Sequence, residues 1–416
     1  MPFEIPVSWK WCKVDDFAYV ASGSTPDKSA FVEKGIPYLK MYNLKNQKID
    51  FDFKPQYIKE EVHNGKLQRS RTEVGDLIMN IVGPPLGKLA IIPSSLPQCN
   101  FNQAAVLIRP IVHKEIIVNF LYYYLSEMSE INSLQTRGNA GQDNISLTQC
   151  MGVHVPMPPL NEQKRIVAEI EKWFALINDL ETDKQELQEA IKKSKMKILD
   201  LAIHGKLVEQ DPNDEPASEL LKHIAPNAAL CDNSHYENTP FEVPQNWVWV
   251  RIKDIAISEL GKTLDRGKNS GKPYDYLCAL NVKWNAFDLT TVKQILLEDN
   301  ERERYLVRRG DLLICEGGDV GRAAIWENDE EIYYQNALHR VRFKGNINQY
   351  FYLYVLQYYK IIGLIDDVSG GVTIKHFTQN SMKKLLFPLP PLAEQKRIVS
   401  KVSELLNLLD KITTEL

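Results

Sequence analysis

The chain has 416 residues, of which 44% are hydrophobic and 25% charged, and its formal net charge at pH 7 is −4. This is the composition of an ordinary globular protein, and no stretch approaches the 18 uninterrupted apolar residues of a membrane span. The net charge neither supports nor excludes contact with phosphates, because a basic groove can lie on an acidic protein. The six cysteines show no C-x-x-C spacing and Met1–Pro6 does not resemble a signal peptide. We therefore expect a cytoplasmic protein with reduced thiols and without a zinc site or disulfides.

Residues 1–155 are predicted to form a first mixed α/β domain. The apolar runs Leu77–Ile81 and Lys88–Ile92 flank a turn rich in Gly and Pro, which is typical of a β-hairpin. The aromatic run Phe120–Leu125 predicts a helix further along the chain.

Residues 156–204 are predicted to form one long helix after a Pro-rich entry, with Asn161 as a candidate N-cap. At 1.5 Å per residue it would run roughly 60 Å, enough to hold two domains apart. Its apolar residues recur in steps of four and three, which is typical of a coiled-coil seam. The seam consists of Ile166, Ile170, Trp173, Ile177, Leu180, Leu187, Ile191, Ile198 and Leu201.

Residues 205–240 are predicted to be a linker, because prolines alternate there with acidic and Asn residues, apart from a short helix at Ala217–Ile224. Residues 241–387 are predicted to form a second mixed domain with a hairpin around residues 316–321 and a helix at Tyr350–Tyr359. Residues 388–416 are predicted to form a shorter second helix. Its seam repeats that of the first helix at Ile398, Val402, Leu405, Leu409 and Ile412.

The two halves are copies of one unit. The sequence FEIP with Trp9 and Trp11 returns 238 residues later as FEVP with Trp247 and Trp249. The block PMPPLNEQKRIV at residues 156–167 matches PLPPLAEQKRIV at residues 388–399 at ten of twelve positions. Ordered matches of this kind predict two similar α+β domains, each followed by a helix.

The motifs of common enzymes are missing. The sequence contains no G-x-x-x-x-G-K-[ST], no H-E-x-x-H and no G-x-S-x-G. The Gly-rich residues 317–321 lie in a predicted hairpin rather than between a strand and a helix, so a nucleotide cradle is not expected there. We therefore predict a chain that is not an enzyme and has neither a catalytic nor a metal site.

The duplicated Pro-rich helix entry, the Gly-Asp-Leu hairpin of each half and the sequence AIHGKLV at residues 202–208 are similar to the specificity subunits of type I restriction-modification enzymes. The resemblance covers essentially the whole chain. It implies two target-recognition domains, residues 1–155 and 241–387, on an antiparallel two-helix coiled coil formed by residues 156–204 and 388–416. It also implies that each domain reads one half of a bipartite, asymmetric site in double-stranded DNA.

The same resemblance implies that the helices dock two methylation subunits, and that restriction (motor-nuclease) subunits join the full complex. Adenine would be methylated at N6 with S-adenosylmethionine bound by the partner, so no cofactor is expected in this chain. No membrane contact is implied.

Candidate DNA contacts are polar residues in the predicted loops, because Arg and Lys read guanine while Asn and Gln read adenine. For each of them the alternative is a turn residue or a solvated side chain. Asn43 and Asn281 recur in both copies, so they are expected to serve the fold or a phosphate rather than to distinguish bases. The candidates are Lys40, Asn43, Asn80, Lys88, Arg137, Asn139, Gln142 and Asn144 in the first half, and Lys262, Arg266, Asn281, Arg322, Asn336, His339, Thr373, Lys375 and His376 in the second.

The helix starts carry a repeated polar block that is a candidate partner-binding surface. One interpretation is capping and i,i+4 pairing within the helix. The favoured alternative is docking of the methylation subunit, or packing between domains, because identical polar residues recur at positions expected to be exposed. The block comprises Glu162, Gln163, Lys164, Arg165, Glu394, Gln395, Lys396 and Arg397.

Three other functions remain open at this point. A protein-only coiled-coil adaptor would explain the helices and the charge, but would leave the variable polar loops without a role. A recognition module of a fused methyltransferase-nuclease would keep DNA reading and change the partner. An unrecognised enzyme is least favoured, because no catalytic constellation is present.

Overall fold

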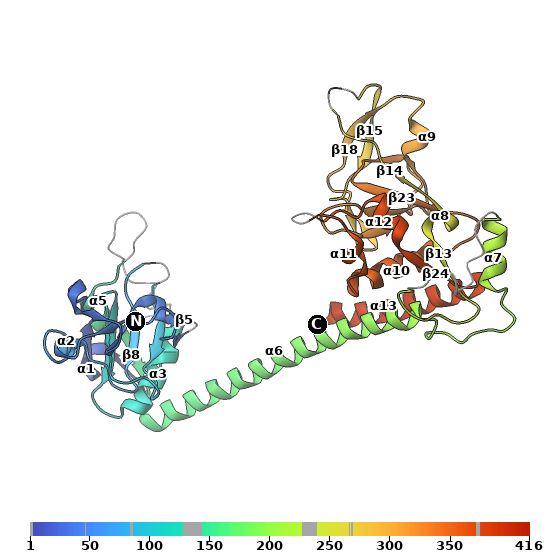
Figure 1. Ribbon diagram of the computed structural model, residues 1–416. Helices are drawn as coiled ribbons and strands as arrows, with labels where there is room; N and C mark the ends of the chain where they lie inside the picture. Colours follow the sequence, from blue (N-terminus) through green and yellow to red (C-terminus); the bar gives the residue numbers. More distant parts are fainter. Residues whose placement is uncertain are drawn as a thin grey trace. The chain divides into compact units, whose positions relative to one another are not determined.

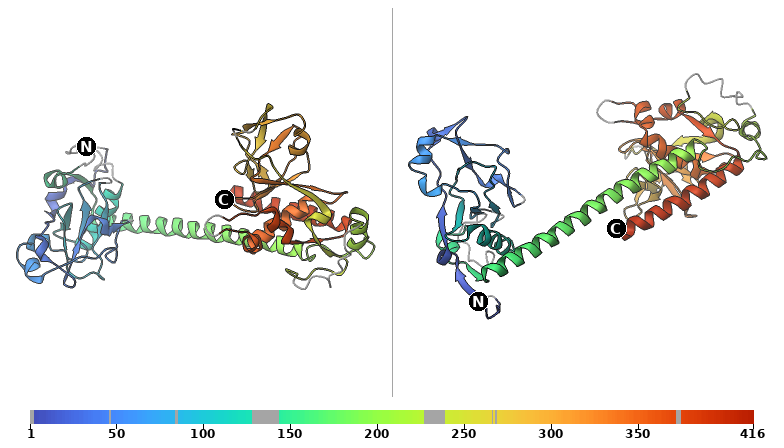
Figure 2. Two further views of the ribbon diagram at one scale, coloured as in Figure 1. Left: turned by 45° about the horizontal axis from the view of Figure 1, so that its top comes forward. Right: turned by 90° about the horizontal axis from the view of Figure 1, so that it is seen from below.

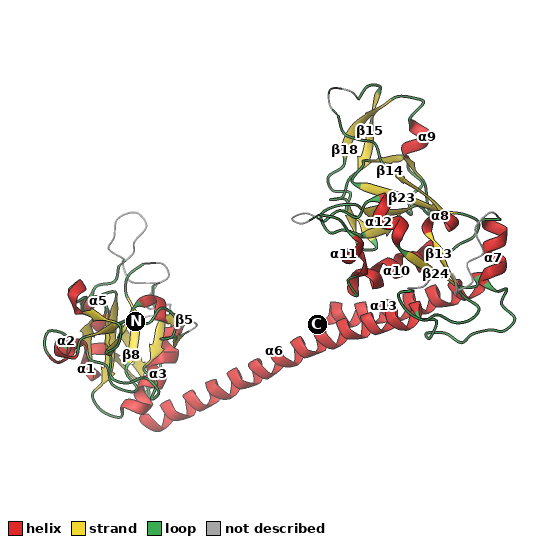
Figure 3. Cartoon of the chain, viewed as in Figure 1, coloured by secondary structure: helices red, strands yellow, loops and turns green. Residues whose placement is uncertain are grey.

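The computed structural model describes residues 3–45, 47–83, 86–127, 144–226, 239–265, 267, 269–371 and 375–416. The chain divides into two compact units, Met1–Glu181 and Thr182–Leu416. Each unit mixes strands and helices, as Figure 3 shows. Among the described residues, no helix is long and apolar enough to cross a membrane.

The first unit is built on two four-stranded sheets. Its elements are β1 (Lys10–Lys13), α1 (Val14–Phe17), β2 (Ala18–Ser22), η1 (Lys28–Ala30), β3 (Phe31–Val32), β4 (Ile36–Leu39), η2 (Met41–Asn43), β5 (Leu44–Lys45), β6 (Lys48–Ile49), β7 (Tyr57–Ile58), α2 (Glu60–Asn64), η3 (Gln68–Ser70), β8 (Leu77–Asn80), β9 (Leu89–Ile91), β10 (Asn100–Phe101), β11 (Ala105–Pro110), α3 (Lys114–Ser126), α5 (Leu147–Met151), β12 (His154–Met157) and the start of α6 (Leu160–Ile203). One sheet has the order β2-β11-β8-β9 and is antiparallel. The other has the order β10-β4-β7-β3 and contains the parallel pair β4–β10.

The second unit repeats this plan after the end of α6. Its elements are α7 (Ala217–Ile224), β13 (Val248–Arg251), α8 (Ile252–Ile255), β14 (Ala256–Leu260), β15 (Lys272–Leu277), β16 (Val282–Lys283), β17 (Ala286–Phe287), β18 (Lys293–Leu297), α9 (Arg302–Tyr305), β19 (Leu306–Val307), β20 (Leu312–Cys315), β21 (Ala323–Ile325), β22 (Ile332–Tyr334), β23 (Leu338–Phe343), α10 (Gln349–Ile361), α11 (Leu364–Val368), α12 (Gln379–Lys384), β24 (Leu386–Leu389) and α13 (Leu392–Glu415). Its sheets have the orders β14-β23-β20-β21 and β18-β15-β22-β19. The predicted hairpins and helices of both halves are thereby confirmed, and so is the short helix α7.

The central strand of each unit is buried on both faces. In β20, Leu312 and Ile314 face one hydrophobic cluster while Leu313 and Cys315 face another. Successive side chains of a strand point to opposite faces, so a continuous apolar run can line two cores. The strand β8 alternates in the same way between two clusters of the first unit. The rigid centre thus carries the hairpin turn that follows each of these strands.

The strand pairs at the base of the units have the same register. Trp11 of β1 lies opposite Pro156 of β12, and Trp249 of β13 lies opposite Pro388 of β24. These partners are the residues that the sequence repeat aligns, so the duplication extends to three-dimensional detail. The two mixed α/β units predicted from the repeat are confirmed.

The helix α13 runs antiparallel to the last part of α6, as Figures 1 and 2 show. Lys184 contacts the carbonyl of Leu416, and Lys195 forms an ion pair with Asp410. The pairing involves the later part of the predicted seam, where Ile191 is buried. The helix starts at Leu160, because the Pro159 carbonyl accepts the amide of Gln163. The prediction of Asn161 as the N-cap is therefore wrong.

The middle of α6 carries apolar side chains without cover. Trp173, Ile177 and Leu180 expose 57%, 48% and 68% of their surface, and Leu187 exposes 42%. These four residues belong to the predicted seam, and we call them the α6 stripe. The coiled coil therefore covers only the later part of the seam.

Candidate nucleic-acid interface

Two loops meet in each unit, and we call them the paired loops. The first is the hairpin turn, described at residues 81–83 and 86–88 between β8 and β9 and at residues 316–322 between β20 and β21. The second is the described segment before the next short helix, residues 144–146 before α5 or residues 375–378 before α12. The Ile145 amide donates to the Ile81 carbonyl at 2.9 Å, and the Phe377 amide donates to the Glu316 carbonyl at 2.7 Å. The same backbone contact therefore fixes both copies.

Three predicted residues of the first unit lie at its paired loops. The buried Asn80 accepts the Lys88 amide on its Oδ1 at 2.6 Å, which closes the hairpin turn. Asn144 forms a β-bridge with Val82, and its Oδ1 is buried without a hydrogen-bond partner. The Lys88 ammonium forms no ion pair with any described residue. Lys88 and Asn144 thus keep polar atoms without a partner among the described residues, whereas Asn80 supports the turn.

The paired loops of the second unit carry Arg322, Lys375 and His376. Arg322 donates to the Ala279 carbonyl at 2.8 Å and lies 3.8 Å from Asp319, so its guanidinium ties the turn to a neighbouring segment. Lys375 is half-exposed and lies 3.7 Å from Asp366. His376 is exposed. It lies beside the turn, because a Cβ added to Gly317 would be 3.6 Å from its Nδ1.

His339 lies beneath these loops and not on their surface. It is fully buried, and its Nε2 lies 2.7 Å from the Phe377 carbonyl. Burial lowers the pKa of His339 to about 4, so the ring is neutral near pH 7 and donates through Nε2. The side chain supports the return loop rather than presenting a group to a ligand.

Asn43 and Asn281 make the same three hydrogen bonds in the two units. The Asn43 side chain accepts the Lys40 amide and donates to the carbonyls of Asp50 and Phe53. Asn281 accepts the Cys278 amide and donates to the carbonyls of Asp288 and Thr291. Both side chains are buried, so their polar groups serve the fold.

The remaining described candidates lie elsewhere. The Lys40 ammonium is 5.7 Å from the centre of the Phe31 ring, a cation–π distance. Lys262 forms an ion pair with Glu301, which lowers the pKa of that carboxyl group. The backbone amide of Asn336 donates to the backbone carbonyl of Lys262, so Asn336 and Lys262 lie side by side. The candidates outside the described residues are Arg137, Asn139, Gln142, Arg266 and Thr373.

The repeated polar block at the helix starts is less exposed than expected. Three of its members are buried, namely Gln163, Glu394 and Gln395. Each of the two glutamines donates from Nε2 to the carbonyl of a proline before its helix, at 2.8 and 2.9 Å. Exposure therefore cannot explain why these three residues recur, and the expectation of exposure is wrong for them. Lys164, Arg165 and Lys396 are exposed, and Glu162 and Arg397 are partly exposed.

Two ion pairs of buried aspartates with partly exposed arginines were not predicted from the sequence. Arg109 binds Asp76 through Nε at 2.8 Å and Nη2 at 2.7 Å, and Arg342 binds Asp311 in the same way at 2.7 and 2.6 Å. These aspartates are the centre of the Gly-Asp-Leu motif. An arginine 33 residues after the first aspartate and 31 after the second was the available signal.

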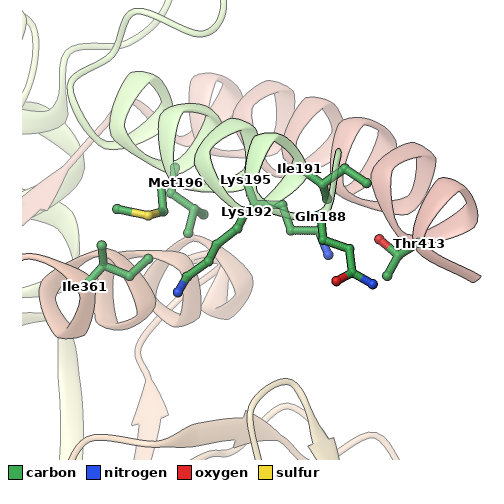
Figure 4. Close-up of a pocket in the computed structure, with 8 residues that line it drawn as sticks. Gln188, Ile191, Lys192, Lys195, Met196, Ile361 and Thr413 are labelled. Atoms are coloured by element: carbon green, nitrogen blue, oxygen red, sulfur yellow. The ribbon is translucent and has the colours of Figure 1, made fainter. Parts of the chain in front are cut away.

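No site with an evident catalytic arrangement emerges among the described residues. They contain no group of three or more His, Cys, Asp and Glu residues that could hold a metal ion. Figure 4 shows an open pocket of about 580 Å³ against the end of α6, lined by Ile191, Met196, Ile361 and the stems of Lys192 and Lys195. Its lining includes no acidic or nucleophilic side chain apart from Thr413.

The comparison with known families rests on both units. A model of the type I restriction modification DNA specificity domain matches residues 6–190 and 244–416. The chain belongs to this family. Each match begins before the strand pair at the base of a unit and extends into the helix that follows it.

Individual relatives agree with this assignment. The chain is 28% identical to the type I restriction enzyme EcoAI specificity subunit of Escherichia coli over 342 residues, 67% of this chain and 57% of that relative. It is 22% identical to the EcoEI specificity subunit of Escherichia coli over 527 residues, 100% of this chain and 80% of that relative. The match to the EcoAI subunit thus spans less than two thirds of that relative's length.

Two solved structures share the fold. The crystal structure of the HsdS subunit from Thermoanaerobacter tengcongensis gives a TM-score of 0.62 at 17% identity, covering 100% of this chain and 93% of that one. A structure on complex assembly and conformational transition of the type I R-M system also gives 0.62, at 19% identity and with coverage of 100% and 94%. The antiparallel helix pair and the duplicated mixed domains are therefore the architecture of specificity subunits.

Proposed function

We propose that this chain is the DNA-reading subunit of a type I restriction-modification complex and that each unit reads one half of a bipartite site in double-stranded DNA. One observation carries the proposal: both units hold the same paired loops with the same backbone contact, yet present different side chains there. At equivalent positions the first unit has Lys88 and Asn144 where the second has Arg322 and His376, and the second also presents Lys375.

The chemistry of these side chains suits base reading. A lysine ammonium donates to guanine O6 and N7, and an asparagine amide pairs with adenine N6 and N7. Because the two sets differ, the two half-sites would differ as well, and the whole target would be asymmetric. The loops hold these groups on the rigid strands β8 and β20, so a base contact would not require the core to rearrange.

The helices are proposed to dock two methylation subunits. The α6 stripe supports this role, because contiguous exposed apolar residues on a helix mark a surface that a protein partner covers. The partner would bring S-adenosylmethionine and transfer its methyl group to adenine N6, and restriction subunits would join the complex. This chain would contribute no catalytic group and no cofactor.

The test is to co-express the chain with the methylation subunit encoded beside its gene and to map methylated adenines over the host genome. We expect methylation at one split, asymmetric motif that disappears when this chain is omitted. A stable complex that methylates no adenine would favour the protein-only adaptor. Failure to form any complex would refute docking on α6 first.

A further inference from the structure

The start of α13 holds a segment of its own unit that is neither helix nor strand, residues 205–214. Gln210 donates to the Glu394 carboxylate, and the Trp247 indole Nε1 donates to its other oxygen at 2.9 Å. Arg397 binds the Asp214 carboxylate through Nη2 at 2.6 Å and Nη1 at 3.3 Å. One short segment therefore supplies an amide donor to a buried glutamate and a carboxylate to an arginine.

The contacts explain how Glu394 remains buried. The side chain is fully covered, and burial raises the pKa of its carboxyl group while the hydrogen bonds from Trp247 and Gln210 lower it. A buried carboxylate is costly unless hydrogen bonds satisfy its oxygens. The segment is thus part of the folded base and not a loose connection.

The first unit contains the same pocket residues without the segment. Trp9, Glu162 and Arg165 correspond to Trp247, Glu394 and Arg397, and the strand pairs beside them have the same register. The turn that presents each indole is also shared, since the amides of Trp9 and Trp247 donate to Pro6 and Pro244 at 2.9 and 3.0 Å. The two units therefore share these three residues, the strand pair beside them and the turn before the tryptophan.

In the first unit the polar groups of these three side chains have no hydrogen-bond partners among the described residues. The Trp9 Nε1 is buried and has no hydrogen-bond partner. The side chains of Glu162 and Arg165 have no partner among the described residues, and Arg165 is exposed where Arg397 is partly covered. In the second unit the acceptor of the Trp247 indole is Glu394 itself. A buried donor without a partner costs about 1–3 kcal/mol, so an occupant that holds Glu162 in the position of Glu394 would let Glu162 accept from the Trp9 Nε1 and would be stabilised.

We propose that Trp9, Glu162 and Arg165 form a docking site for a segment of a partner protein with the chemistry of residues 205–214. That segment carries an amide donor for Glu162 and, four residues later, a carboxylate for Arg165. The pocket is separate from the paired loops and from the α6 stripe. The inference rests on the proposed function only in taking the partner to be another subunit of the complex.

The test uses the full chain and a labelled peptide of residues 203–216, measured by fluorescence anisotropy. We expect saturable one-to-one binding that Arg165→Glu weakens at least tenfold. A peptide carrying Asp214→Lys should bind the unchanged chain at least tenfold more weakly and should recover on the Arg165→Glu variant. Arg397→Glu is the matched control at the occupied pocket and should leave peptide binding to the first unit unchanged.

A second readout locates the peptide. The indole N–H signal that is lost in Trp9→Phe, identified by NMR, should shift when the unchanged chain binds the peptide. No saturable binding at about 1 mM, the effective concentration of a short tethered segment, would overturn the proposal. So would binding that Arg165→Glu leaves intact, or self-association of the chain that Arg165→Glu abolishes, since a second copy would then be the occupant. Methylation of adenine, measured in parallel, reports on the proposed function independently.

Discussion

Asn43 and Asn281 hold equivalent loops closed, one in each unit, with three hydrogen bonds from a single buried amide. Their recurrence follows from the backbone groups that they satisfy at equivalent places in the two loops. The side chains that differ between the copies lie instead at the paired loops. At the residue scale, repetition thus marks structure and variation marks the candidate reading surface.

Replacing Asn281 by Ala should lower the free energy of unfolding by about 3 kcal/mol, since each of three hydrogen bonds contributes about 1 kcal/mol. Urea denaturation measures this change. Asn336→Ala is the matched control, because its side chain has no partner among the described residues, and it should shift stability by less than about 0.5 kcal/mol. An equal effect of the two substitutions would contradict the structural role of Asn281.

His339 should make the stability of the second unit depend on pH. Its folded pKa is lowered to about 4, below the unfolded value of about 6.5. Its contribution is therefore fully present above pH 6.5 and is lost as the pH falls toward 4, because the unfolded chain takes up the proton first. The loss should be on the order of 3 kcal/mol.

Denaturation of the unchanged chain at several pH values measures this dependence. His339→Gln keeps a donor for the Phe377 carbonyl and should flatten the curve between pH 6.5 and 4. His376→Gln removes an exposed imidazole and should not. A curve of the same slope in all three proteins would assign the pH dependence to other groups.

Among the elements, the hairpins, the helices and the long α6 could be predicted from the sequence, because apolar runs, Gly-rich turns and heptad spacing are local signals. The ion pairs of Arg109 with Asp76 and of Arg342 with Asp311 could not, since they join residues that only the sheet brings together. Burial of Gln163 and Gln395 was also missed, although each glutamine donates to a proline carbonyl only five residues earlier in the chain. Nothing in the block EQKR indicates that each glutamine donates a hydrogen bond to a proline carbonyl.

The α6 stripe can be tested by one charge on each face of the helix. Leu180→Asp should weaken complex formation with the methylation subunit at least tenfold without lowering the melting temperature, because its side chain is 68% exposed. Ala175→Asp is the matched control, since it lies about 200° around the helix from Trp173. Co-purification and calorimetry measure the two effects, and equal behaviour of the variants would exclude the stripe as the docking surface.

At the scale of the whole molecule, duplication separates what each unit does from what both share. Lys375→Ala with His376→Ala should degrade only one half of the methylated motif. Lys88→Ala with Asn144→Ala should degrade only the other. Each lost base contact is worth about 1–3 kcal/mol, so discrimination at the affected positions should fall about 5- to 150-fold.

Sequencing of methylated adenines in cells carrying each variant measures this outcome. Glu330→Gln, an exposed position away from the paired loops, serves as the control and should leave both halves unchanged. If both double variants altered the same half, the assignment of one unit to one half-site would be refuted.

The exposure of the α6 stripe also gives the protein an intrinsic optical reporter. Of the seven tryptophans, Trp173 is the exposed one, and the other six are buried or partly buried. A partner that covers α6 would move this indole from water into an apolar environment and shift its fluorescence to shorter wavelength. Assembly on the helix could then be followed in real time on the unlabelled chain, with Trp173→Leu as the reference that reports only the other six tryptophans.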